Sequence, residues 1–454
     1  MSKVIGIDLG TTFSAIASLD DLGNPEVLAS IEDNRKITAS AVYLKDNEVI
    51  VGDKALNYLK DQSNNVILQT KREMENDVVY STDEGKWVTD KDLVDAYTPA
   101  QVSSLILKKL KEYTSDVKKV VITVPAMFAE KARQATLDAA KIADLEVIEL
   151  INEPTAAVLH YASLPGVEVG GRVMIFDLGG GTFDVTFAEV KNKKVDVMTS
   201  RGDKYLGGRD FDKEITKLMK KKYFDVHNVE IDIENNKEYI HKAEEVKKIL
   251  SVKDKANIEI TGPKGPQKIE ITQEEFEESI QTYIEKIKML IEEAMEASGM
   301  NPSRINQTLL VGGSTRMPII TKVLTQMMGK PPVKGVNVDE AVVCGAAIYA
   351  GLKTEKETLS DQQQEALKEV NLTDVCNFYM GTLAYVTDSH TGRRVVANTI
   401  IIERDTKLPV SVTKRYTTIS EGQEELECNV TQSEGPEDNR EFVNIIHEEM
   451  LKLP

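Results

Sequence analysis

The hydrophobic pattern of the first part of the chain alternates between buried strands and helices. The runs "KVIGID" (3–8) and "KKVVITVP" (118–125) are almost continuously apolar, as in strands that are covered on both faces. Residues 129–143 are rich in alanine and predict a helix packed on that sheet. From Val173 the order restarts with a strand, a glycine-rich turn, a second strand and a helix from about Asp210. The pattern predicts an α/β fold.

The same alternation continues further along the chain. Apolar side chains recur at helical spacing through 276–294 and predict one long amphipathic helix over 273–298. Residues 307–318 again predict a strand, a glycine turn and the start of a helix. Residues 339–352 predict a helix of small side chains, which is suited to close packing against its neighbours.

The pattern of polar and apolar residues changes after the predicted helix of small side chains. Residues 353–369 are polar, without glycine or proline, and predict a linker or an exposed helix. In 393–431 the apolar residues alternate with polar ones, and the pattern is interrupted at Pro409 and at Glu421-Gly422. This pattern predicts a separate, antiparallel β module.

Composition narrows the class of protein. With 454 residues and a net charge of −18, the chain has room for about three domains and no electrostatic support for nucleic-acid binding. No apolar run approaches the length of a membrane span, and the first residues enter a strand pattern directly, so neither a membrane partner nor a signal peptide is expected. Cys344, Cys376 and Cys428 lie far apart and form no zinc or disulfide pattern, which favours the cytoplasm.

Two glycine turns carry nearly the same phrase. "VIGIDLGTTFSAI" occupies Val4–Ile16 and "VMIFDLGGGTFDV" occupies Val173–Val185. The repetition indicates two related halves, each with a strand–turn–strand hairpin at the edge of its sheet. Hairpins that face each other across a cleft would present backbone N–H groups and threonine hydroxyls to an anion. Neither a P-loop nor a Rossmann glycine pattern is present, so this would be a different kind of phosphate clamp.

Asp8 and Asp177 occupy equivalent positions where each buried strand meets its turn. An isolated aspartate there usually caps the turn. Two equivalent aspartates beside two Gly/Thr turns favour a metal role instead, because a buried carboxylate is costly without a partner. Mg²⁺ keeps most of its water and uses few carboxylates, so the two aspartates are expected to reach a Mg²⁺–phosphate complex through water.

An ordered set of motifs resembles the seventy-kilodalton heat-shock chaperones of the DnaK type. The resemblance covers about Lys3–Leu352 and continues weakly to the end of the chain. The motifs that carry it are "IGIDLGTTFS", "VITVPAMFAEKARQATLDAAKIADLEVIELINEPTAAVLHYA", "FDLGGGTFDV", "GDKYLGGRDFD", "VGGSTRMP" and "VDEAVVCGAAIYAG".

The resemblance implies a fold class and a division into domains. It implies an α/β, duplicated actin-like (ribonuclease H-like), two-lobed ATPase domain followed by a short antiparallel β module. The implied parts are a nucleotide-binding domain 1–353, with lobes at about 1–168 and 169–353, a linker 354–375 and a partial β-sandwich peptide-binding module 376–454.

The resemblance also assigns the site residues. Lys71 would reach the terminal phosphate, Glu153 would activate the attacking water, and Asp177 and Thr182 would complete the catalytic set. The implied nucleotide-binding residues are Asp8, Gly10, Thr11, Thr12, Gly179, Gly180, Gly181, Glu244, Lys247, Lys248, Ser251, Gly312, Gly313, Ser314, Arg316 and Asp339.

Two further groups of residues follow from the resemblance. Pro125 and Arg133 match a pair linked to the switch between nucleotide states. Tyr385, Ile419 and Leu426 match positions that line the peptide groove, although ordinary sheet core explains such apolar residues equally well.

The implied activity is slow, conformationally coupled ATP hydrolysis by a stress-response chaperone that binds extended hydrophobic segments of unfolded proteins. ATP or ADP, Mg²⁺ and K⁺ are the implied ligands, and a J-domain co-chaperone and a nucleotide exchange factor are the implied partners. The linker "VNLTDV" (370–375) has Asn and Thr in place of the family's leucines, which predicts weaker docking on the nucleotide domain.

Three alternatives remain open at the level of sequence. A sugar or acetate kinase on the same fold would need a pocket and a base for its acceptor, and no candidate residues stand out. An actin-like filament subunit would need a stacking surface. A nucleotide-sensing ATPase module that is uncoupled from peptide binding is compatible with the polar linker and the short β module.

Overall fold

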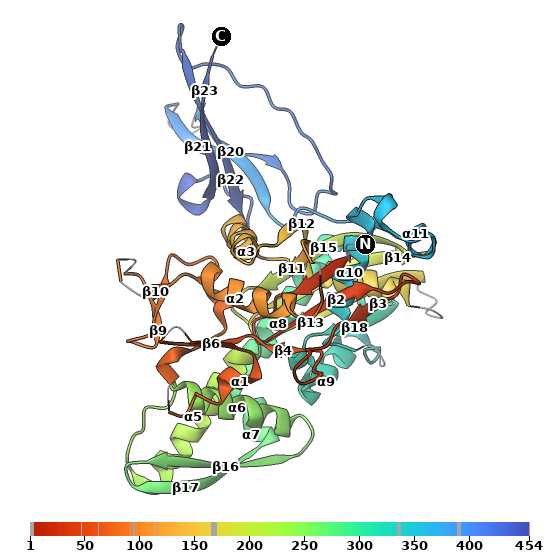
Figure 1. The fold of residues 1–454 in the computed structure, drawn as a ribbon. Helices are drawn as coiled ribbons and strands as arrows, with labels where there is room; N and C mark the ends of the chain where they lie inside the picture. The colour runs from red at the N-terminus through yellow and green to blue at the C-terminus, as the bar shows by residue number, and fades with distance from the viewer. Residues whose placement is uncertain are drawn as a thin grey trace.

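The structure is a computed structural model with two lobes and a C-terminal sheet that stands on them (Figure 1). The last strand, β23 (Asn444–Lys452), reaches the far end of this sheet. The described residues are 4–46, 48–61, 63–90, 92–93, 96–115, 117–164, 170–333, 337–387 and 392–453. Within these ranges, no helix combines the length and the apolar character that crossing a membrane requires.

The first lobe is built on a mixed sheet with the order β12-β11-β1-β2-β3, with β4 paired to β2. β1 runs parallel to β11 and antiparallel to β2, so β1 and β2 form the predicted hairpin around the first glycine turn. The strands are β1 (Ile5–Asp8), β2 (Phe13–Leu19), β3 (Pro25–Val27), β4 (Thr38–Ala39), β11 (Lys119–Val124) and β12 (Glu146–Asn152).

The second lobe repeats this arrangement in a sheet with the order β18-β13-β14-β15-β19. β13 runs parallel to β18 and antiparallel to β14, as β1 does to β11 and β2, which confirms the second predicted hairpin. The strands are β13 (Gly170–Leu178), β14 (Phe183–Lys191), β15 (Lys194–Asp203), β18 (Gln307–Val311) and β19 (Asn371–Thr373).

Two buried helices, α4 (Glu153–Ser163) and α10 (Ala341–Lys353), pack on each other and contact both sheets. Their contact depends on small side chains, as predicted for 339–352. A Cβ atom added to Gly345 would lie 1.8 Å from the carbonyl oxygen of Ala156. The core around them contains apolar residues from both lobes, so these helices join the lobes at the base of the cleft.

Smaller elements cover the first lobe and form its outer part. Helices α2 (Pro99–Lys111) and α3 (Glu130–Ile142) pack on each other, and α3 confirms the helix predicted over 129–143. The remaining elements are α1 (Asp53–Leu56), η1 (Ser63–Asn65), η2 (Thr70–Glu73), and the strands β5 (Ala41–Lys45), β6 (Glu48–Val51), β7 (Val66–Leu68), β8 (Val79–Ser81), β9 (Lys86–Val88) and β10 (Ala96–Tyr97).

The second lobe carries its own outer elements. Helices α5 and α6 pack on each other beside a hairpin of β16 and β17. The bounds are α5 (Gly208–His227), α6 (Lys237–Leu250), β16 (Lys255–Gly262), β17 (Gly265–Thr272), α7 (Gln273–Ser279), α8 (Gln281–Ser298), η3 (Pro302–Arg304), η4 (Gly313–Arg316) and α9 (Pro318–Met328).

The prediction of one helix over 273–298 is wrong, because the structure has two helices that meet at Ile280. The backbone of Ile280 leaves the helical region, with φ −100° and ψ 6°. The side-chain amide of Gln281 donates a hydrogen bond of 2.8 Å to the carbonyl of Glu277, and such a side chain inserted into the hydrogen-bond ladder can bend a helix. The apolar stripe is kept across the break, which is why its periodicity gave no sign of it.

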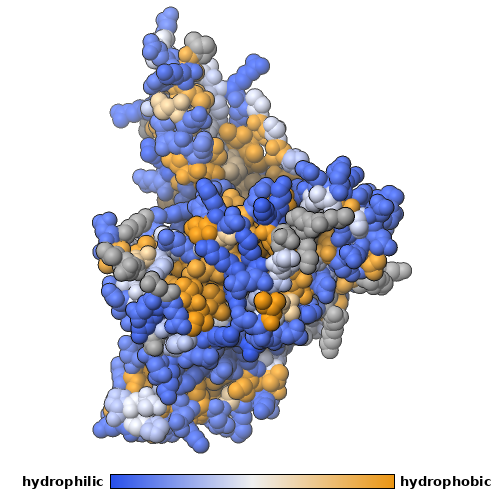
Figure 2. Space-filling view, viewed as in Figure 1, coloured by the Kyte–Doolittle hydropathy of each residue, from blue (hydrophilic) through white to orange (hydrophobic). Residues whose placement is uncertain are grey.

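The C-terminal sheet has the order β21-β20-β22-β23, and all its pairs are antiparallel, as predicted. Hydrophobic and polar residues are mixed over its surface (Figure 2). At its base, Phe378 and Met380 pack against Met127 and Ala129 of the first lobe. The elements after α10 are η5 (Lys356–Thr358), α11 (Asp361–Leu367), β20 (Tyr379–Thr387), β21 (Arg394–Ile402), β22 (Glu425–Ser433), η6 (Arg440–Phe442) and β23 (Asn444–Lys452).

Candidate active site

A cavity of about 450 Å³ lies between the lobes and gathers almost every predicted nucleotide and catalytic residue. Of the predicted set, only Gly181 is not part of its lining, and Gly181 lies between two residues that are. The predicted residues in the lining are Asp8, Gly10, Thr11, Thr12, Lys71, Glu153, Asp177, Gly179, Gly180, Thr182, Glu244, Lys247, Lys248, Ser251, Gly312, Gly313, Ser314, Arg316 and Asp339.

The two hairpin turns face each other at close range inside this cavity. A Cβ atom added to Gly180 would lie 1.9 Å from Oγ1 of Thr12, and one added to Gly181 would lie 2.5 Å from Oγ1 of Thr11. Any side chain at these glycines would therefore push the turns apart. The sequence repeat thus produces two glycine-rich turns in contact, which is the arrangement that a clamp for an anion requires.

Lys71 and Glu153 form a buried ion pair in the cavity. The Nζ atom of Lys71, in η2, donates to Oε1 of Glu153, the first residue of α4. The ring of Phe128 lies 5.7 Å from the same ammonium group. Both side chains line the cavity together with the glycine turns, and their pairing fixes the position of the Lys71 ammonium group there.

Three aspartates of the two hairpins lie at or beside the cavity: Asp8 and Asp177 line it, and Asp184 lies opposite Asp177 in the β13–β14 hairpin. Burial raises the pKa of Asp8 to about 6, with a further rise from Glu153, although Lys71 and a hydrogen bond of 2.8 Å from Thr123 oppose it. Burial and then Glu153 also raise the pKa of Asp177 and, to about 8, that of Asp184. Oδ2 of Asp177 is buried and has no hydrogen-bond partner among the residues that the structure describes. Such carboxylates fit a site that takes up a cation.

The outer part of the cavity is lined by paired charges. Lys247 of α6 lies 2.7 Å from Asp212, and Lys248 lies 2.7 Å from Glu244. On the opposite wall, Nη1 and Nη2 of Arg316 donate to the carboxylate of Asp339, at 2.8 and 2.7 Å. Ser314 donates a hydrogen bond of 2.9 Å to the carbonyl of Gly179, which ties this wall to the second glycine turn.

Several residues of the site were missed by sequence reasoning. Arg72 holds the second glycine turn from the other lobe, because its Nε and Nη2 donate to the carbonyl of Gly181 and its guanidinium pairs with Asp210. Arg209 lines the cavity itself. Arg209 lies inside the quoted motif "GDKYLGGRDFD", and Arg72 directly follows Lys71, so these positions were the available signal.

Comparison with known proteins identifies the family. A family model described as "Hsp70 protein" matches residues 4–444. The chain belongs to the Hsp70 family. The "Chaperone protein DnaK" of Thermotoga neapolitana is 35% identical over 454 residues, which cover 95% of this chain and 71% of the relative. These matches confirm the family resemblance, and with it an ATP-dependent DnaK-type chaperone that is an ATPase. The two-lobed actin-like ATPase fold of Hsp70 proteins agrees with the mixed α/β architecture.

The predicted switch residues of this Hsp70 chain lie in one hydrogen-bonded chain. The carbonyl of Pro125 accepts from the backbone N–H of Phe128 at 3.1 Å, and the carbonyl of Phe128 accepts from Nε of Arg133 at 3.0 Å. Nη2 of Arg133 donates to Oδ1 of Asn152 at 2.7 Å. Because Asn152 directly precedes Glu153, this series of hydrogen bonds ends beside the predicted catalytic carboxylate.

The polar linker contacts both lobes. β19 pairs with β15, with Leu372 opposite Val195, and Val375 is buried. Oδ2 of Asp374 accepts hydrogen bonds from Nδ2 of Asn152 at 3.1 Å and from Oγ1 of Thr155 at 3.2 Å. The linker is therefore held by hydrogen bonds to Asp374 as well as by apolar burial. The expectation of weaker docking considered apolar burial alone.

The backbone pairing does not bring the three predicted groove residues together. Tyr385 lies on β20 opposite Val396, with 57% of its surface exposed, and Leu426 lies on β22 opposite Leu451. Ile419 lies in the segment before β22 and is 51% exposed. Their assignment to a peptide groove stays a prediction.

Proposed function

We propose that this Hsp70 chain hydrolyses ATP in the cavity between its lobes and uses the reaction to control binding of extended peptide segments. The observation that carries the proposal is the meeting of both glycine turns with the Lys71–Glu153 pair in one cavity. The turns bind the phosphate oxygens, Lys71 neutralises the terminal phosphate, and Glu153, with Asp177 and Thr182, orients the attacking water. Phosphoryl transfer to water needs positioning and charge neutralisation more than covalent help.

The remaining cavity residues hold the nucleoside. α6 supplies Glu244, Lys247, Lys248 and Ser251 on one side of the ribose and base. The loop at β18 and η4 supplies Gly312, Gly313, Ser314 and Arg316 on the other side, with Asp339 fixing Arg316. The cavity volume of about 450 Å³ lies within the range of small-molecule sites.

The donor set fits a Mg²⁺ ion held largely through water. The described residues contain no group of three or more His, Cys, Asp or Glu side chains placed to hold a metal directly. Asp8 and Asp177 would hold the hydrated ion, in keeping with the few direct carboxylates that Mg²⁺ uses. When bound, the ion would neutralise phosphate charge. K⁺ is proposed as a second cation beside the same carboxylates, because Asp184 lies opposite Asp177 in the β13–β14 hairpin.

The proposed domains are those that the resemblance implies: a nucleotide-binding domain 1–353 with lobes at about 1–168 and 169–353, a linker 354–375 and a peptide-binding module 376–454. The equivalent strand pairings of the two sheets support an origin by duplication. We place peptide binding on the C-terminal sheet, with Tyr385, Ile419 and Leu426 as groove residues. A J-domain co-chaperone, a nucleotide exchange factor and a cytoplasmic location complete the proposal.

Single-turnover ATP hydrolysis, with and without an excess of a leucine-rich extended peptide, tests the proposal. We expect Asp177→Asn to abolish hydrolysis and Asp225→Asn, at an exposed position on α5, to leave it unchanged. Acceleration by the peptide would support a coupled chaperone. Hydrolysis that ignores the peptide would reduce the function to a nucleotide-sensing module, and the absence of hydrolysis by the wild type would overturn the proposed site.

A further inference from the structure

Arg209 differs from every other cation that lines the cavity. Four lining cations, Lys71, Lys247, Lys248 and Arg316, are each paired with a carboxylate. Arg209 is the fifth, and among the described residues its side chain has neither a hydrogen bond nor an ion pair. The cavity therefore contains one guanidinium group whose charge is not matched by a partner.

The surroundings of Arg209 make an unpaired guanidinium group there unusual. Within the described ranges, its Nε atom is buried without an acceptor. Burial and then the neighbouring Arg72 lower the pKa of Arg209, while carboxylates that form no ion pair with it raise that pKa, namely those of Glu73, Asp210 and Asp212. Arg72 is not available to bind an incoming anion, because its guanidinium group already binds Gly181 and Asp210. An unmatched buried charge is costly, so a cation kept in this position implies an anion that arrives from outside the chain.

The position of Arg209 indicates which part of the nucleotide it meets. Its backbone N–H donates a hydrogen bond of 2.8 Å to the carbonyl of Gly180, so its Cα is fixed at the second glycine turn. That turn is where the proposed function places the phosphates, whereas the ribose and base are neutral. A guanidinium group binds phosphate oxygens through two parallel hydrogen bonds, which an ammonium group cannot reproduce.

We infer that Arg209 is a phosphate-binding residue that adds a cation to the two turns and Lys71 when the nucleotide binds. The inference rests on the proposed nucleotide site and extends it to a residue outside the predicted set. It makes nucleotide affinity depend on a charge that the free protein leaves unpaired.

Calorimetric titration of the full chain with ATP, ADP and adenosine, at fixed Mg²⁺, tests the inference. We expect Arg209→Gln to weaken ATP and ADP binding by about tenfold or more, the range of one lost charge-assisted contact, and to leave adenosine binding unchanged. Arg209→Lys should bind with intermediate affinity. Lys213→Gln, one turn further along α5 and outside the cavity lining, is the matched control and should bind all three like the wild type.

The outcomes separate this inference from the proposed function. Wild-type affinity of Arg209→Gln for ATP and ADP, or an equal loss for adenosine, would overturn the role of Arg209 alone. A wild-type chain that binds neither ATP nor ADP would overturn the proposed site and this inference with it.

Thermal unfolding distinguishes phosphate binding from a structural role. Because the side chain of Arg209 has no partner among the described residues, Arg209→Gln should have a Tm equal to or above that of the wild type without nucleotide. ADP should then raise the Tm of the variant less than that of the wild type, since stabilisation follows affinity. A lower Tm of the nucleotide-free variant with an undiminished ADP shift would contradict the inference.

Discussion

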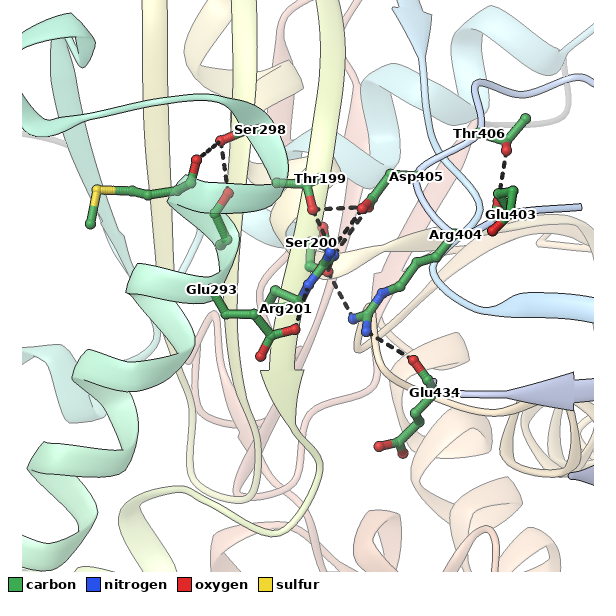
Figure 3. A network of polar contacts seen from close by, with 12 residues as sticks. Thr199, Ser200, Arg201, Glu293, Ser298, Glu403, Arg404, Asp405, Thr406 and Glu434 are labelled. Atoms are coloured by element: carbon green, nitrogen blue, oxygen red, sulfur yellow. Dashed lines mark hydrogen bonds and ion pairs between the residues drawn. The ribbon is translucent and has the colours of Figure 1, made fainter. Parts of the chain in front are cut away.

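Arg201 of β15 and Asp405 of the C-terminal region form an ion pair, with 2.8 Å between Nη2 and Oδ2 (Figure 3). Arg201 also binds Glu293 of α8 at 2.8 Å, and the neighbouring Arg404 donates to the backbone carbonyls of Ser200 and Glu434. The guanidinium group of Arg201 is buried, with 8% of its side chain exposed. This network joins the second lobe to the C-terminal sheet across a polar contact.

The first prediction concerns this contact. Arg201→Gln removes the cation that pairs with Asp405 and leaves its carboxylate with the hydrogen bond from Thr199, so the C-terminal sheet should detach from the lobe more often. We expect limited proteolysis within 354–375 to become several-fold faster. Lys217→Gln, which removes an exposed lysine paired with Glu214, is the control and should not change the cleavage rate. Equal cleavage of both variants would show that the ion pair does not hold the sheet.

The second prediction concerns the route from the linker to the active site. Asp374→Ala removes the acceptor of Asn152 and Thr155 while the adjacent Glu153 stays in place. We expect basal ATP hydrolysis to stay within about twofold of the wild type and stimulation by peptide to be lost, because the contact that links them is gone. Hydrolysis is measured in single turnover with and without peptide. Stimulation that survives in Asp374→Ala would exclude this route.

Strand positions and glycine turns could be predicted because they follow from local pattern. The hairpins at Asp8 and Asp177 each combine a buried strand with a glycine turn, and both features are visible in the chain. The family resemblance then predicted a set of nucleotide-binding residues, and the structure places nearly all of them in the lining of one cavity. Contacts between distant segments had no such signal: Arg72 reaches Gly181 only after the lobes come together.

Other features depend on three-dimensional geometry that the amino-acid sequence does not show. The bend at Ile280 leaves the apolar stripe unchanged, so its period was read as one helix. The docking of the linker was judged from missing leucines, whereas Asp374 contributes hydrogen bonds to Asn152 and Thr155. The unpaired state of Arg209 becomes visible only when the partners of the other cations are known.

The third prediction concerns the contact between α4 and α10. Gly345→Ala places a methyl group 1.8 Å from the carbonyl oxygen of Ala156, and neither backbone can move without disturbing both lobes. We expect a loss of roughly 1–3 kcal/mol in the free energy of unfolding, as for other overpacked cores, seen as a lower Tm by calorimetry. Gly351→Ala, on the same helix, meets leucine methyl groups that can shift and should cost less. Equal Tm values for the two variants would contradict this account.

Lys237 of α6 connects the outer parts of the two lobes, and no carboxylate of the described part of the chain pairs with it. Its Nζ atom donates to the carbonyl of Ser63 at 2.9 Å, to the carbonyl of Val66 at 2.8 Å and to the hydroxyl of Tyr80. The ammonium group also lies 4.9 Å from the centre of the Tyr80 ring. Burial lowers the pKa of Lys237 from 10.5 to about 8.

The fourth prediction is the pH dependence that follows from Lys237. Above about pH 8 the folded chain loses this proton while the unfolded chain keeps it up to about pH 10, so the unfolded state binds more protons and stability rises with pH in that window. Wild-type stability relative to Lys237→Met should therefore increase by roughly 1 kcal/mol per pH unit. Calorimetric Tm values at pH 7, 8, 9 and 10 measure the difference. Lys242→Met, which removes a lysine paired with Glu238 at 2.7 Å on the same helix, should show no such rise relative to the wild type. A difference between the wild type and Lys237→Met that stays constant with pH would show that Lys237 keeps an ordinary pKa.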